Sequence, residues 1–158
     1  MRERIVMNTG PLIALGKMQA FDVAGQLSCE FCCPPQVEAE LLSGLAIGHS
    51  VIRPSWITVI PLQATLTPFA SIALDDGEAA VIQLALEQQI NRVCIDETKG
   101  SRAALSVGLQ VVGSLGVLGK AKSEGLISAV SPFVALAQQS GLYYDAKLLA
   151  SFLQGMGE

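Results

Sequence analysis

The chain alternates short apolar runs with longer amphipathic segments. Five short runs have the length and the apolar or β-branched composition of strands: 5–8, 30–33, 56–60, 91–95 and 109–112. Segments with helical spacing of apolar residues separate or follow them: 11–18, 21–27, 36–42, 77–89, 97–107, 114–123, 131–139 and 145–153. Strands that alternate with helices form parallel sheets covered on both faces, so the pattern predicts an α/β fold.

The first strand ends on a polar residue, Asn8. Thr9 and Gly10 form a turn, and Pro11 suits the first position of a helix because its missing N–H would be unpaired there. A polar side chain at this junction lies at the carboxyl edge of a parallel sheet, where open α/β folds place their sites. Asn8 is therefore either a site residue or simply a turn residue that caps the helix.

Two further strands lead into helices in the same way. The strand at 91–95 ends at Asp96, and the strand at 109–112 is followed by Gly113 and Ser114, of which Ser114 is the predicted helix cap. The helix at 77–89 carries Glu78 in its first turn, where a negative charge also suits the helix dipole. The carboxyl edge of the sheet is thus predicted to gather several acidic side chains.

The helix at 36–42 carries two glutamates, Glu38 and Glu40. Residues two apart point about 200° apart around a helix, so only one of them can face a given site. Spacing alone leaves open which one does.

The overall composition restricts the function. The chain has 158 residues, of which 51% are hydrophobic and 15% charged, with a formal net charge of −4. This acidic balance argues against binding nucleic acid through bulk positive charge, while the apolar content suggests a partner or a second copy. The stretches 54–74 and 103–119 are interrupted by prolines or glycines, and no signal peptide is recognisable, so we expect a soluble, cytoplasmic protein.

The cysteines and the single histidine give no metal motif. Cys29 and Cys32 have the C-x-x-C spacing, but no second pair accompanies them and His49 lies in a predicted loop. We expect Cys29, Cys32, Cys33 and Cys94 to be buried, reduced thiols, and His49 to be a solvated side chain.

Several motifs in this order resemble those of PIN domains, and specifically the prokaryotic PIN-like family DUF3368. The motifs are Asn8-Thr9-Gly10-Pro11-Leu12-Ile13, Pro35-x-Val37-x-x-Glu40-Leu41, Gly77-Glu78-Ala79-Ala80, Ile95-Asp96-Glu97-x-Lys99-Gly100-x-Arg102 and Gly113-Ser114-Leu115-Gly116. The resemblance covers about residues 5–127. It implies a three-layer α/β/α PIN-like fold with a mainly parallel sheet of four to five strands, in a single domain spanning 1–158. The helices over 130–155 are expected to pack on this fold or to bind a partner.

The resemblance also implies an activity and a site. It implies an endoribonuclease dependent on Mg²⁺ or Mn²⁺, often the toxin of a toxin–antitoxin pair, that acts on RNA and forms a homodimer. The implied catalytic and metal-binding residues are Asn8, Glu40, Glu78 and Asp96. Glu40 is thereby favoured over Glu38. Hard divalent cations prefer such oxygen ligands, and they activate water for phosphodiester hydrolysis.

Four further side chains have predicted supporting roles. Thr9 and Ser114 are placed to orient a ligand or water. Lys99 and Arg102 lie three apart on one helix face, where they either contact RNA phosphates or are simply solvated charges.

Asn8 departs from the aspartate of the family motif. Asparagine keeps a carbonyl ligand but removes one negative charge, so we expect one weakly held metal ion and either a slow nuclease or an inactive relative that binds RNA or protein. A small-molecule-binding domain is a third alternative, although no G-x-G-x-x-G follows a strand. Phosphatase chemistry with Asp96 as nucleophile lacks a supporting basic residue.

Overall fold

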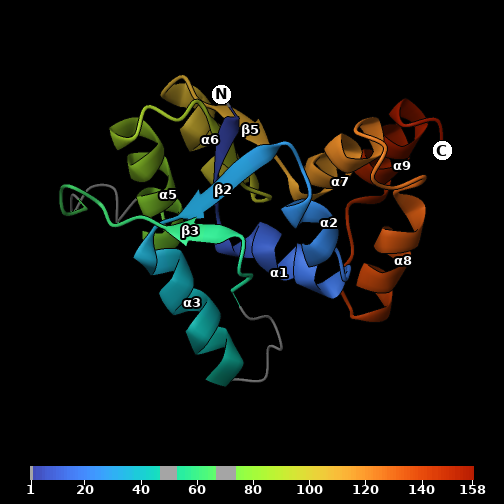
Figure 1. Cartoon of the computed structure of the whole chain (residues 1–158), viewed down its shortest axis with the longest axis horizontal. Coiled ribbons are helices and arrows are strands. Elements are labelled where there is room, and N and C mark those ends of the chain that lie inside the picture. The colour runs from blue at the N-terminus through green and yellow to red at the C-terminus, as the bar shows by residue number, and fades with distance from the viewer. Residues whose placement is uncertain (1, 47–52, 67–73) are drawn as a thin grey trace.

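The computed structural model describes residues 2–46, 53–66 and 74–158. Five strands form one parallel sheet in the order β3-β2-β1-β4-β5 (Figure 1). They are β1 (Glu3–Met7), β2 (Cys29–Cys33), β3 (Ile57–Val59), β4 (Arg92–Cys94) and β5 (Gln110–Val112). The predicted parallel sheet is confirmed, and β3 lies at its edge, as the proline after this strand indicates.

Eight helices of the described residues flank the sheet and complete the expected three-layer α/β/α fold (Figure 1). They are α1 (Thr9–Lys17), α2 (Phe21–Gly25), α3 (Pro35–Ala46), α5 (Asp76–Glu87), α6 (Thr98–Ser106), α7 (Ser114–Ser123), α8 (Ser131–Gln139) and α9 (Ala146–Gly155). Helix α5 packs on β1 and β4 beside α6, whereas α7 packs on β5 beside α1 and α2. Within the described ranges, no helix is long and apolar enough to cross a membrane.

Two local predictions are wrong. Helix α3 was expected to end at residue 42 but continues to Ala46, because a single helical glycine costs only about 1 kcal/mol and does not end a helix by itself. Ser114 is not the cap of α7: Gly113 occupies the cap position, and Ser114 is the first helical residue, with its hydroxyl used elsewhere. The predicted loop position of His49 lies outside the described residues.

The middle of the sheet is buried on both faces. Ile5, Val6 and Met7 of β1 are each at most 2% exposed, as expected for a central strand between two helical layers. All four cysteines are buried and free, which confirms their predicted role as small apolar side chains. Desolvation raises the pKa of Cys32 to about 11 and of Cys33 to about 12, so both are protonated thiols at neutral pH.

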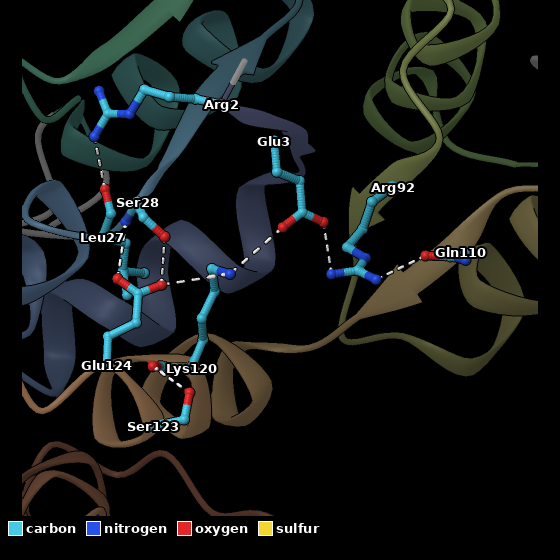
Figure 2. A network of polar contacts seen from close by, with 9 residues as sticks. All are labelled: Arg2, Glu3, Leu27, Ser28, Arg92, Gln110, Lys120, Ser123 and Glu124. Atoms are coloured by element: carbon cyan, nitrogen blue, oxygen red, sulfur yellow. Dashed lines mark hydrogen bonds and ion pairs between the residues drawn. The ribbon is translucent and has the colours of Figure 1, made fainter.

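Charged side chains join the strands at the amino edge of the sheet, where the strands begin. Glu3 pairs with Arg92 at 2.6 Å and with Lys120 at 3.5 Å, and Lys120 also pairs with Glu124 (Figure 2). The Glu124 carboxylate accepts hydrogen bonds from the backbone N–H and the hydroxyl of Ser28. Two cations and two anions therefore neutralise one another at this edge.

A second acidic side chain holds the C-terminal helices together. The Glu158 carboxylate accepts hydrogen bonds from the backbone N–H groups of Val130 and Ser131 at the start of α8, and it pairs with Lys122 of α7 at 3.0 Å. Val130 has no side chain able to cap α8, so Glu158 supplies the missing acceptor from a distant part of the chain.

We expect the hydrogen bonds of the Glu158 carboxylate to make the stability of the protein fall at acidic pH. Hydrogen bonds from Ser131 and Val130 lower the pKa of Glu158 from 4.5 to about 2. The stabilisation it provides is therefore complete above pH 4.5 and is lost as the pH falls towards 2. Thermal unfolding measured over this range should show a smaller loss of stability for Glu158→Gln than for the wild type. An equal loss in both proteins would contradict this assignment.

Candidate functional site

The carboxyl ends of β1 and β4 meet at the point where the strand order reverses. The chain winds from β1 towards β3 on one side and from β4 to β5 on the other. Open α/β sheets bind ligands in the crevice outside this point. Asn8 follows β1 directly, Asp96 follows β4 after Ile95, and the Asn8 backbone N–H donates to the carbonyl of Cys94 at 3.0 Å. The two junctions predicted to face each other are therefore neighbours.

Asn8 is 7% exposed and occupies the N-cap position of α1. Its side chain makes no capping hydrogen bond, although capping would be the ordinary structural role of asparagine there. Helix capping therefore does not explain why the Asn8 amide lies at the carboxyl edge of the sheet.

Glu40, rather than Glu38, faces this edge. The Glu40 carboxylate accepts a hydrogen bond from the Thr9 hydroxyl and lies against Gly77, where any side chain would overlap it. Glu38 instead pairs with Arg53 at 2.7 Å. Desolvation and the charge of Asp75 raise the pKa of Glu40, while the hydrogen bond from Thr9 opposes the shift. Thr9 therefore supports a predicted acidic residue.

Glu78 begins α5 as part of a capping box. Its backbone N–H donates to the Asp75 carboxylate at 2.7 Å, and its own carboxylate accepts from the Asp75 backbone N–H at 3.4 Å. This local role does not satisfy the side chain, because Glu78 is only 2% exposed and its Oε1 atom has no hydrogen-bond partner in the described residues. Desolvation, the adjacent Glu97 carboxylate and the charge of Asp75 raise the pKa of Glu78 to about 7.

Asp75, Glu78 and Glu97 form an acidic cluster. One carboxylate oxygen from each lies within 4.8 Å of the others, from the cap of α5, its first turn and the cap of α6. Negative charges this close repel one another unless a proton or a cation lies between them. Three convergent carboxylates with one buried, unpaired oxygen fit a divalent cation such as Mg²⁺ or Mn²⁺.

Asp96 is held by Ser114. Its two carboxylate oxygens accept hydrogen bonds from the backbone N–H of Ser114 at 2.8 Å and from its hydroxyl at 2.9 Å. Desolvation raises the pKa of Asp96, and both hydrogen bonds work against that shift. Ser114, which is completely buried, thus orients an acidic side chain rather than capping its own helix.

The predicted residues line one continuous edge but do not all converge. Glu78 belongs to the acidic cluster, whereas the carboxylates of Glu40 and Asp96 are bound to Thr9 and Ser114 respectively. The sequence pattern did not identify Asp75 or Glu97 as site residues. The signal for Glu97 was present, because it follows Asp96 directly at the end of a strand.

An open groove of about 530 Å³ runs beside this edge. Thr9, Glu40 and Asp76 line it together with Gln36, whose buried Oε1 atom has no hydrogen-bond partner in the described residues. Lys99 and Arg102 are exposed at the start of α6. Glu40 and Asp76 in the lining would repel a phosphate group unless a cation lay between the carboxylates and the phosphate.

Comparison with known proteins identifies one relationship. The model of one family, described as DUF3368, a PIN domain, matches residues 4–158. The match includes α8 and α9, which lie beyond the motifs found in the sequence over about residues 5–127. No curated protein matches the chain. The family supports nuclease chemistry in general.

The buried carboxylate of Glu78 should destabilise the metal-free protein. Because its pKa rises from 4.5 to about 7 on folding, stability should fall as the pH increases through this window. In a buffer containing a chelator at pH 8, Glu78→Gln should raise the free energy of unfolding by about 1–3 kcal/mol. Urea unfolding at pH 8 and pH 4.5 tests this, since the gain should disappear at the lower pH. A less stable variant at pH 8 would contradict the assigned electrostatics.

Proposed function

The chain belongs to the PIN-domain family, and on that premise we propose that it is a metal-dependent ribonuclease. The observation that carries the proposal is the buried Glu78 carboxylate, which lies beside Asp75 and Glu97 and whose Oε1 atom has no partner among the residues that the structure describes. A purely structural glutamate at a helix N-terminus would need only the capping contacts that Glu78 already has.

We propose that Glu78 and Glu97 hold Mg²⁺ or Mn²⁺ with Asp75, and that Asp96 and Asn8 complete the site along the same edge. Glu40, held by Thr9, faces the adjoining groove. A bound divalent cation would polarise a phosphodiester and activate a water for its hydrolysis. Asp96 and Glu40 each offer a carboxylate that a hydroxyl already orients, and we assign to them the binding or deprotonation of water.

RNA is the proposed substrate. The groove beside Glu40 is open, and the Gln36 carbonyl oxygen in its lining is an acceptor without a partner in the described residues. Lys99 and Arg102 are exposed near the acidic cluster on α6 and are assigned to contacts with RNA phosphates. The net charge of −4 makes these local contacts, rather than bulk attraction, the basis of binding.

Asn8 sets the expected strength of the site. It supplies a carbonyl oxygen but no charge, so we propose that one metal ion is held weakly and that cleavage is slow. The alternative function is a silent relative that binds RNA or protein without cutting, and the missing carboxylate at Asn8 is what favours it. We propose the toxin role and an antitoxin partner from the family resemblance, and a homodimer from that resemblance and the apolar composition. The proposed cytoplasmic location rests on the sequence, in which no signal peptide is recognisable.

Metal binding can be measured directly by calorimetric titration with Mn²⁺. Glu78→Gln and Glu97→Gln should each weaken binding at least about tenfold, because each removes a charged ligand. Asn8→Asp should strengthen it about tenfold or more. Glu87→Gln provides a control of equal charge change, since Glu87 lies at the opposite end of α5 from Glu78. No binding to the wild type or to Asn8→Asp would overturn the metal site.

Cleavage of a single-stranded RNA in the presence of Mn²⁺ tests the reaction. We expect slow cleavage by the wild type, faster cleavage by Asn8→Asp, and a loss of at least about 100-fold in Asp96→Asn and Glu78→Gln. A chelator should abolish activity. Cleavage that persists in Asp96→Asn or with chelator would point to a contaminating nuclease. Metal binding without cleavage, even in Asn8→Asp, would favour the silent relative.

A further inference from the structure

A tyrosine from the C-terminal part of the chain reaches the carboxyl edge. Tyr144 lies between α8 and α9, and its hydroxyl is 2.7 Å from the Ser114 hydroxyl. Ser114 in turn donates to Asp96. Helix α8 lies beside α1, and α9 packs on Gly119 of α7 (orange and red in Figure 1). A connected line of three polar groups therefore runs from the segment between these two helices to the site.

The available acceptors determine which group donates in each of the two hydrogen bonds that link Tyr144, Ser114 and Asp96. The Asp96 carboxylate is the strongest acceptor, so it takes the single proton of the Ser114 hydroxyl. Tyr144 must then donate to the Ser114 oxygen, because its other hydrogen-bonding partner among the described residues is the weakly accepting sulfur of Met18 at 3.8 Å. Desolvation raises the pKa of Tyr144 to about 12, so the phenol keeps its proton at working pH.

We propose that Tyr144 is a positioning residue that fixes the Asp96 carboxylate for metal binding by orienting the Ser114 hydroxyl. The inference rests on the proposed function, because it takes Asp96 as part of the metal site. Donation by Tyr144 polarises the Ser114 hydroxyl and strengthens its bond to Asp96. It also prevents Ser114 from rotating away.

The start of α7 holds Asp96 by contacts with Gly113 and Ser114, although Asp96 itself is exposed. A Cβ atom at Gly113 would lie 2.8 Å from Asp96 Oδ1, so glycine there lets the carboxylate approach the start of α7 closely. Ser114 is completely buried, so Tyr144, rather than bulk water, is the partner of its hydroxyl. The C-terminal helices would therefore contribute to the site through one hydrogen bond, beyond any packing role.

The test is a calorimetric titration of Mn²⁺ into the full chain. Tyr144→Phe removes only the hydroxyl and should weaken binding about tenfold, as loss of an outer hydrogen-bonding partner typically does. Tyr143→Phe is the matched control, because the neighbouring ring is 72% exposed, and it should leave binding unchanged. Thermal unfolding without metal checks that both variants are folded.

A double-variant comparison separates positioning from packing. If Tyr144 acts through Ser114, Tyr144→Phe should add no further loss of Mn²⁺ affinity in a Ser114→Ala background. The same loss in both backgrounds, or unchanged binding in Tyr144→Phe alone, would overturn the inference while leaving the metal site intact. Absence of Mn²⁺ binding by the wild type would overturn the proposed function and this inference together.

Discussion

The carboxyl edge is organised around a buried carboxylate, Glu78, that has no basic partner within the described parts of the chain. Glu78 lies in the first turn of α5, where the helix dipole and the Asp75 backbone N–H favour its negative form. Burial and the neighbouring acids disfavour the negative form of Glu78. Their effect is the larger one in the metal-free protein, since the pKa of Glu78 rises to about 7. The fold thus keeps an unfavourable charge where a cation would make it favourable.

Acidic side chains have basic partners at the amino edge of the sheet but cluster with one another at the carboxyl edge. At the amino edge, Glu3 and Glu124 are paired with Arg92 and Lys120, so the charges there are neutralised and join strands to α7 (Figure 2). At the carboxyl edge, acids meet acids or hydroxyl groups instead of basic side chains in the described residues. A stabilising network at one edge is therefore compatible with an electrostatically strained site at the other.

Hydroxyl groups replace basic residues as the supports of the site. Thr9 holds Glu40 and Ser114 holds Asp96, each by a neutral donor that orients the carboxylate without cancelling its charge. A lysine or arginine in these positions would pair with the acid and weaken its attraction for a cation. Such support preserves negative charge for metal binding, which is consistent with the proposed nuclease.

The sequence by itself determined the parallel sheet and its polar strand ends, because apolar periodicity and the Asn8 and Asp96 junctions are local features. It left Glu38 and Glu40 undecided until the family resemblance favoured Glu40, and it misassigned Ser114 as a cap. Only the tertiary structure decided which acids converge, because Asp75 and Glu97 meet through the packing of α5 beside α6. Tyr144 could not be found from local pattern, since thirty residues separate it from Ser114.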